Sequence, residues 1–290
     1  MIDKTREIAL KILYEIEKEK AYSNIILNKY IKENKGKLNS KDIGLISELT
    51  YGVTMWNLTL EEIIKKYSKI KLKKISPWIK NILKMGIYQI VFLDKIPKSA
   101  AVNESVTLAK RYGHTASSNF VNAILRKVEK QDYLELTKIS NQEERISKMT
   151  SMPIWIVKQL LKETKDIKNV ERICINLKQK PKITVRINTI KINEKKLEEI
   201  LKEQKIEYIK ISEYIKDKDY ENKDIIQEIG KDFYILKNLK NLENTEIFKK
   251  GYITVQDLSA GMSAFLLNPN KKEKVLDACS APRWKNHVYS

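Results

Sequence analysis

The chain has 290 residues and carries 56 Lys and Arg against 37 Asp and Glu, which gives a formal net charge of +19. This length predicts about two domains, and no apolar run approaches the roughly 18 residues of a membrane-spanning helix. Two cysteines are too few for a disulfide framework or a four-cysteine zinc site. The N-terminal segment is charged throughout, unlike a secretory signal. A reducing cytoplasm is therefore the expected location, with no metal and no membrane partner.

The positive charge favours a polyanionic partner. Nucleic acid is favoured over membrane, because no basic tail or lipidation motif appears. The alternative is compositional bias: the chain is rich in Lys and Ile but has only 8 Gly and 6 Pro, as AT-rich coding would produce. Charge alone leaves both interpretations open.

The first 130 residues have the periodicity of helices. Apolar residues recur on one helical face of the first segment, at Ala9, Ile12, Leu13 and Ile16. Ser76-Pro77 is typical of a helix start, where Ser caps the end and Pro loses no hydrogen bond. Pro97 interrupts the pattern and Gly113 ends the helix that follows. These signals predict an all-α bundle of about six helices over residues 1–130.

The periodicity fades into a polar stretch at residues 131–150, which predicts a linker. Beyond it Pro153 opens another helical segment. Ile183, Val185 and Ile187 alternate with polar residues, as in a half-buried strand, and Asn193 is suited to cap a helix. Residues 151–240 are therefore predicted to form a small α+β domain.

The last segment, residues 241–290, has the pattern of an α/β unit. It predicts a strand at Tyr252–Val255, a helix at Leu258–Leu267 and a second strand at Lys274–Ala278. A strand that runs into a turn of small residues is how a doubly wound α/β sheet begins its cofactor site. We expect the incomplete start of a Rossmann-like domain.

Residues 80–130 strongly resemble the NusB-like RNA-binding fold. The matching landmarks are Gly86-Ile87-Tyr88, Ile96-Pro97, Val102-Asn103-Glu104 and Phe120-Val121-Asn122. The resemblance implies a helical domain that occurs alone, in transcription antitermination factors, and fused to the front of methyltransferases.

Basic residues of the first domain are candidate contacts to RNA phosphates. Lys4, Arg6 and Lys11 lie near one another on the first predicted helix, and Arg111 is grouped with them. For each of these residues, a solvated surface position is the alternative.

Later segments resemble the RNA cytosine-5 methyltransferases. The matching residues are Trp155 after Pro153, Val185-Arg186-Ile187-Asn188-Thr189, Gly251 to Asp257, and Val275 to Pro282. The resemblance implies methyl transfer from S-adenosylmethionine to carbon 5 of one cytosine in small-subunit (16S) ribosomal RNA. On the predicted strand Arg186 and Asn188 share the polar face, which suits phosphates or base edges; the alternative is an ordinary exposed edge.

The resemblance places the cofactor loop at the end of the chain. Its residues would be Cys279, Ser280, Ala281, Pro282 and Lys285.

The chain departs from the family pattern in this loop. Arg283 and Trp284 stand where the family has two glycines, and glycines are needed where the backbone must approach the ligand closely. Read in a shifted frame, codons for these residues can encode Gly-Gly-Lys-Thr, so one inserted base is our hypothesis for the difference.

The family's nucleophilic cysteine would lie past the last residue. Cys174, in an apolar helical stretch, is not expected to replace it. As given, the chain is expected to bind ribosomal RNA, as a monomer in the simplest case, without methylating it. The alternative is a non-enzymatic NusB-type RNA-binding module.

Overall fold

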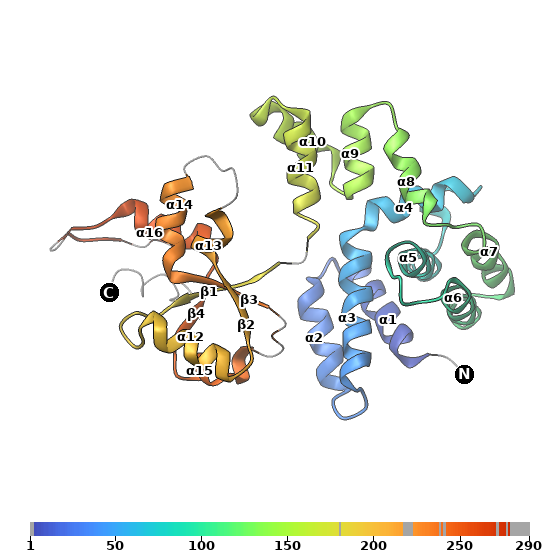
Figure 1. Cartoon of the computed structure of the whole chain (residues 1–290). Coiled ribbons are helices and arrows are strands. Elements are labelled where there is room, and N and C mark those ends of the chain that lie inside the picture. Colours follow the sequence, from blue (N-terminus) through green and yellow to red (C-terminus); the bar gives the residue numbers. More distant parts are fainter. Residues whose placement is uncertain are drawn as a thin grey trace. The chain divides into compact units, whose positions relative to one another are not determined.

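The computed structural model describes residues 3–179, 181–216, 223–237, 239, 242–270, 273–276 and 278. The chain divides into two compact units, residues 1–179 and residues 180–290. We call them the bundle unit and the sheet unit and describe each by itself (Figure 1). No helix in the described ranges is both long enough and apolar enough to cross a membrane.

The bundle unit is entirely helical in its described residues. It begins at Asp3, whose side chain accepts hydrogen bonds from the backbone N–H groups of Thr5 and Arg6 and so caps the first helix. Its helices are α1 (Lys4–Glu19), α2 (Ser23–Glu33), α3 (Ser40–Met55), α4 (Asn57–Tyr67), η1 (Leu72–Lys74), α5 (Pro77–Phe92), α6 (Lys98–Tyr112), α7 (Thr115–Leu125), α8 (Gln131–Glu135), η2 (Leu136–Lys138), α9 (Gln142–Thr150), α10 (Ile154–Thr164) and α11 (Ile167–Asn176).

The apolar stripe predicted on the first helix is buried, as expected. Ala9 and Leu13 pack into the main core around α5, whereas Ile12 packs into a second core against α2 and α3. Ser76 caps α5 with Pro77 in its first turn, and Gly113 ends α6. The predicted all-α bundle is therefore confirmed.

Residues 131–150, predicted as a linker, instead form α8, η2 and α9. Asp132 is only 4% exposed and accepts hydrogen bonds from Lys66 and Tyr67 of α4. Thr59 donates to the backbone carbonyl of Lys148 at 2.6 Å. These polar contacts with α4 hold the short helices α8 and α9 in place, although their sequence has little apolar periodicity. The three helices α9, α10 and α11 share a small core that includes Cys174.

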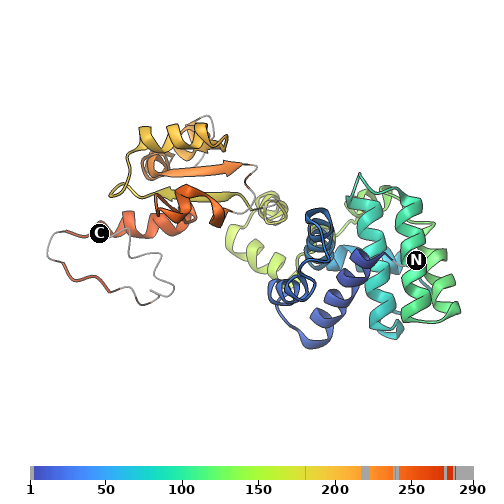
Figure 2. The ribbon, with the colours of Figure 1, turned by 90° about the horizontal axis from the view of Figure 1, so that it is seen from below.

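The sheet unit contains one antiparallel sheet with the strand order β2-β3-β1-β4. Helices cover both of its faces: α12 and α15 lie on one side, and α13, α14 and α16 lie on the other (Figure 1). In Figure 2 the gold α12 runs along the direction of the neighbouring strands. The elements are β1 (Ile183–Ile187), α12 (Glu194–Glu203), β2 (Glu207–Lys210), α13 (Ile211–Lys216), α14 (Lys223–Ile229), η3 (Gly230–Asp232), β3 (Phe233–Lys237), η4 (Leu242–Asn244), α15 (Glu246–Lys249), β4 (Ile253–Val255) and α16 (Leu258–Leu267).

The chain order β1-α12-β2-β3-α15-β4 is a split β-α-β arrangement. The insertion between β2 and β3 supplies α13 and α14. Alternation along the central strands separates the two cores: Val185 and Tyr234 face α12, and Phe233 faces α13 and α14. A small α+β domain is present, but its bounds differ from the predicted 151–240. Within that range α10 and α11 belong to the bundle unit, and the sheet is completed by β4, past residue 240.

The Rossmann-like start predicted for residues 241–290 is not seen in the described residues. The strand expected at Tyr252–Val255 is β4, and it pairs antiparallel with β1, so it completes the small sheet. Residues 274–276 are not in a strand. A strand needs a hydrogen-bonded partner, and none of the described strands pairs with this segment. The remaining residues of that prediction lie outside the described part of the chain, except for residue 278, which is in a turn.

Candidate nucleic-acid interface

One face of α1 carries a row of polar and aromatic side chains toward solvent. Lys4, Glu7, Lys11, Tyr14 and Lys18 follow one another at three- and four-residue spacing, which places them along the same side of the helix. Lys4 and Lys18 are exposed, and the three between them are partly exposed. We call this row the α1 face.

Glu7 organises the middle of the α1 face. Its Oε1 accepts a hydrogen bond from the Tyr112 hydroxyl at 2.6 Å and lies 3.2 Å from Nε of Arg111 and 3.7 Å from Nζ of Lys11. Burial, the largest single effect, acts to raise the pKa of Glu7, but the Tyr112 hydrogen bond and the two cations outweigh it and lower the pKa. Glu7 is thus held as a carboxylate that joins the end of α6 to α1.

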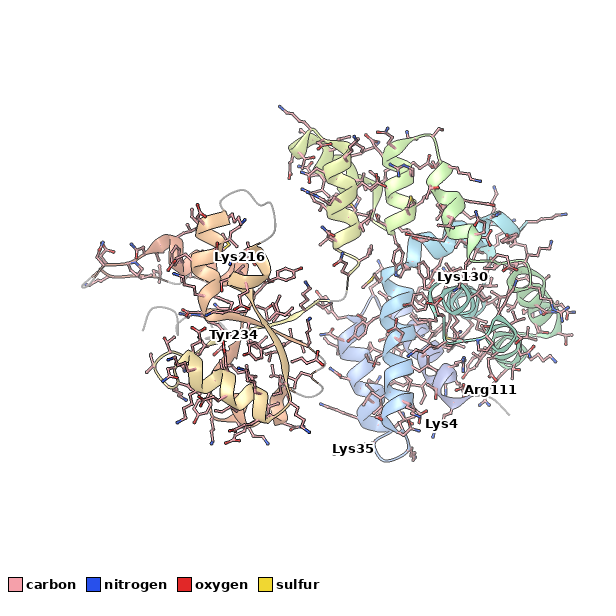
Figure 3. All side chains as sticks on the ribbon, in the orientation of Figure 1. Lys4, Lys35, Arg111, Lys130, Lys216 and Tyr234 are labelled. Carbon is pink, nitrogen blue, oxygen red and sulfur yellow. The ribbon has the colours of Figure 1, made fainter. Side chains whose placement is uncertain are left out.

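Arg111 reaches solvent beside this contact. Its side chain is 56% exposed, so one carboxylate contact leaves most of the guanidinium accessible. Figure 3 shows Lys4 and Arg111 at the same end of the bundle unit. The structure therefore brings Lys11 and Arg111 together around Glu7, and Lys4 lies about one turn before Glu7 on the same face of α1.

An aromatic stack continues the α1 face toward α5. The Tyr14 and Trp78 rings are stacked at 3.7 Å between centroids, and the Trp78 and Tyr112 rings are stacked at 4.6 Å. The three rings come from α1, α5 and α6 and are partly exposed. Partly exposed aromatic rings beside cations suit contacts with single-stranded nucleic acid.

Arg6, predicted as a phosphate contact, is buried instead. It is 9% exposed, its Nε donates to Oε1 of Gln89 at 2.7 Å, and its guanidinium pairs with Asp3. Arg6 is two residues after Lys4 in α1, so the two side chains point to different sides of the helix. The prediction placed Arg6 on the accessible surface, but its side chain joins α1 to α5.

In the sheet unit, Arg186 and Asn188 have different environments. Arg186 lies on β1, an interior strand, half-buried between Phe233 of β3 and Thr254 of β4, so the alternative of an exposed edge does not apply. Asn188 follows the strand, and its Nδ2 donates to the carbonyl of Gly251 at 3.2 Å. Asn188 therefore holds the end of β1 to the turn before β4.

The predicted cofactor loop, Cys279 to Lys285, lies outside the described residues. Cys174 is fully buried, and burial raises the pKa of its thiol, so it has the inert environment expected for it. His114 caps α7, with its ring nitrogen accepting from the backbone N–H of Ser117. Among the described residues, no cluster of three or more His, Cys, Asp or Glu side chains could hold a metal.

Sequence reasoning missed Glu7, Trp78 and Tyr112 as parts of this surface. Lys4, Glu7 and Lys11 share helical spacing, which was a usable signal. The contribution of α5 and α6 was not visible, because Trp78 and Tyr112 are brought to α1 only by the packing of the bundle.

Two family models match successive parts of the chain. Residues 3–130 match the NusB family, and residues 152–216 match the Methyltr_RsmF/B-like, ferredoxin-like domain. The second match covers α10 and α11 as well as the first part of the sheet unit. The fold is therefore that of a NusB-type helical domain followed by a ferredoxin-like domain of the kind found in RsmF/B-like methyltransferases.

The chain belongs to the NusB family through its first domain. That region is 36% identical over 129 residues to the transcription antitermination protein NusB of Ruminiclostridium cellulolyticum, of which it covers 88%. The chain is also 32% identical over 281 residues to the probable ribosomal RNA small subunit methyltransferase B of Bacillus subtilis.

Similarity to the methyltransferases extends over almost the whole chain. The Bacillus subtilis alignment covers 97% of this chain and 58% of that protein, so the chain spans under two thirds of the length of such relatives. The solved structure of PH0851 has the same fold over 99% of this chain and 61% of its own, with 15% identity and a TM-score of 0.62.

Proposed function

We propose that this chain is the RNA-binding front part of a ribosomal RNA methyltransferase. The observation that carries the proposal is the order of the two domains, which is matched over 97% of the chain in a probable small-subunit ribosomal RNA methyltransferase. The family reaction would transfer a methyl group from S-adenosylmethionine to carbon 5 of a cytosine in 16S ribosomal RNA. Because that RNA is cytoplasmic in bacteria, the same location is proposed here.

In the bundle unit, Lys4, Lys11 and Arg111 would contact RNA phosphates, and the Tyr14–Trp78–Tyr112 stack would support them. The bundle unit supports this role through its charge as well, with 34 Lys and Arg against 20 Asp and Glu in residues 1–179. Such an excess attracts a polyanion over distances of about 10 Å at moderate salt. Arg186 would add a contact from the sheet unit, whereas Arg6 and Asn188 would act by holding the structure.

The experiment measures RNA binding by the full chain, using fluorescence anisotropy with fragments of 16S ribosomal RNA over a range of salt. The double variant Lys4→Gln, Arg111→Gln should bind about tenfold more weakly. Its slope of log affinity against log salt should fall by about 1.4, because each phosphate of a single strand that is no longer neutralised reduces the slope by about 0.7. The matched control is Lys195→Gln, Lys196→Gln on α12, which should bind as wild type does. Equal affinities for the double variant and the wild type would refute this assignment.

S-adenosylmethionine binding is proposed to be impaired in this chain, because Arg283 and Trp284 replace the two glycines of the family loop. The remaining loop residues, Cys279 to Pro282 with Lys285, would hold the cofactor in the family. Isothermal titration of the chain with S-adenosylmethionine is expected to show no binding, and the variant Arg283→Gly, Trp284→Gly is expected to improve it. Tight binding by the unaltered chain would contradict this proposal.

A second candidate is a NusB-type module without methyltransferase activity. The 36% identity of the first domain to a transcription antitermination protein favours it. The two proposals differ in what the sheet unit does. If removing the positive charge of Arg186 leaves RNA binding unchanged while the chain still captures a transcription-complex protein, the second candidate is supported.

A further inference from the structure

The loop between α4 and α5 contains a group of lysines whose side chains are not paired with any described residue. Lys69, Lys71, Lys73 and Lys74 are all exposed, and none of them forms an ion pair or side-chain hydrogen bond with any described residue. By contrast Lys65 and Lys66, just before them, are paired with acidic residues. We call these four residues the loop lysines.

The backbone that carries the loop lysines is held in place. Ser68 Oγ accepts from the backbone N–H of Ile70 at 3.1 Å and donates to its carbonyl at 2.8 Å. Leu72 packs against the main core, Ile75 is buried, and residues 72–74 form the short helix η1. Four cations on an anchored backbone lose less conformational entropy on binding than cations on a free chain.

The packing of α1 against α5 places this loop relative to the α1 face. Arg6, near the start of α1, contacts Gln89 near the end of α5, whereas Tyr14 stacks on Trp78 near the start of α5. The two helices are therefore antiparallel, and the loop that leads into α5 lies toward the far end of α1 from Lys4. Ten residues from Lys4 to Tyr14 correspond to about 15 Å along the helix.

Cations and aromatic rings follow one another between these two ends. Lys4, Lys11 and Arg111 come first, the Tyr14–Trp78–Tyr112 stack follows, and Lys74 is four residues before Trp78 in the chain, which is at most about 15 Å away. Glu7, the acidic residue of this surface that contacts Arg111 and Lys11, is already engaged by Tyr112 as well. Cations at both ends and aromatic rings in the middle are what a single strand of RNA can bind through phosphates and bases.

We propose that the loop lysines form the distal end of a single RNA path that starts at Lys4 and Arg111 and crosses the aromatic stack. The proposal rests on the RNA-binding function proposed above and adds the extent of the bound strand and the residues that it passes. A long single strand would contact both ends, and a short one would not reach from one end to the other.

The test uses the full chain and uridine oligomers of about 16 and about 4 nucleotides, a range that single-strand sites commonly span. The variant Lys69→Gln, Lys71→Gln, Lys73→Gln, Lys74→Gln should bind the longer oligomer at least tenfold more weakly. Its salt slope should fall by about 2 to 3, because up to four phosphates would no longer be neutralised, at about 0.7 each. The decrease in affinity should be smaller with the short oligomer.

Two controls test whether the affinity depends on the position of the removed charges or only on the net charge of the chain. The variant Lys195→Gln, Lys196→Gln, Lys202→Gln, Lys205→Gln removes the same charge from α12 and its end, and should keep the wild-type affinity. Replacing the four loop lysines with Arg should also keep it, because Arg preserves the charge. Circular dichroism melting should show the same folded state for all variants.

The outcomes are distinguishable. If the wild-type chain does not bind RNA, the proposed function fails and this inference fails with it. If the wild type binds but the loop variant keeps its affinity and salt slope, the RNA path does not include the loop, while the proposed function stands. An equal decrease in affinity for the α12 variant would show a nonspecific charge effect and would overturn the proposed path.

Discussion

Arg6 and Gln89 form a buried contact that joins α1 to α5, with Nε of Arg6 donating to Oε1 of Gln89 at 2.7 Å. Gln89 is fully buried, and its own amide donates to the carbonyl of Met85. The arginine is further held by Asp3 at the cap of α1. A residue of the kind that usually contacts phosphates is here a structural link between two helices.

Replacing Arg6 should therefore lower stability. Arg6→Ala should destabilise the bundle unit by about 2 kcal/mol, because it leaves the Gln89 oxygen buried without its charged donor. For a unit of this size, that corresponds to a fall in melting temperature of about 4 to 8 °C. Circular dichroism melting measures it, and Lys4→Ala on the exposed side of α1 should change it little. Unchanged melting of the Arg6 variant would show that the contact is not needed.

Asp132 should contribute to the loss of stability of the bundle unit at acid pH. Burial acts to raise the pKa of Asp132, but the backbone N–H of Glu129 together with Lys66 and Tyr67 outweighs it and lowers the pKa below the ordinary 3.8. A group whose pKa is lower in the folded state stabilises the fold above its ordinary pKa, and this stabilisation is lost as the pH falls through the folded value.

Asp132→Asn should accordingly destabilise the bundle unit by about 2 kcal/mol at neutral pH, through the loss of charge-assisted hydrogen bonds. The difference from wild type should shrink as the pH falls below 4. Urea unfolding at neutral and acid pH measures both values. A difference that stays constant with pH would rule out this role for the carboxylate.

Two glycines of α3 should respond in opposite ways to the same substitution. A Cβ at Gly52 would collide with the Tyr88 ring, whose hydroxyl is held by Glu48 at 2.8 Å, whereas a Cβ at Gly44 meets nothing. Gly52→Ala should destabilise by about 2 kcal/mol through overpacking. Gly44→Ala should stabilise by about 0.5 to 1 kcal/mol through helix propensity. Denaturant unfolding of the two variants checks the sign of each effect, and destabilisation by both would contradict the packing described.

Tyr234 has a buried hydroxyl that is unsatisfied within the described part of the chain. The residue is fully buried on β3, and its hydroxyl has no hydrogen-bond partner among them; it is labelled in Figure 3. Tyr234→Phe should therefore stabilise the sheet unit by about 1 kcal/mol, since it removes an unsatisfied polar group and keeps the ring. Tyr208→Phe, at a more exposed ring that packs edge-on against Tyr234, serves as the control. A fall in melting temperature for Tyr234→Phe alone would mean that the hydroxyl is bonded.

Local sequence patterns predicted most helices of the bundle and the first strand of the sheet. The reason is that caps and periodic apolar residues act within one turn or one strand, as at Ser76 for α5 and at Ile183, Val185 and Ile187 for β1. The segment 131–150 was misassigned because Asp132 and Thr59 stabilise it through contacts with residues more than 60 positions apart, which leave no periodic signal.

The amino-acid sequence was sufficient to predict the helical front half and the alternating strand of the second half, and it carries the positive charge and the resemblance to NusB-like and cytosine-5 methyltransferase segments. Which cations face solvent depends on how the helices pack. Lys4 and Arg6 are two residues apart on one helix, yet one is exposed and the other is bonded to α5. Tertiary packing also decided that β4 pairs with β1, because a strand pattern records which face is apolar and does not record its partner.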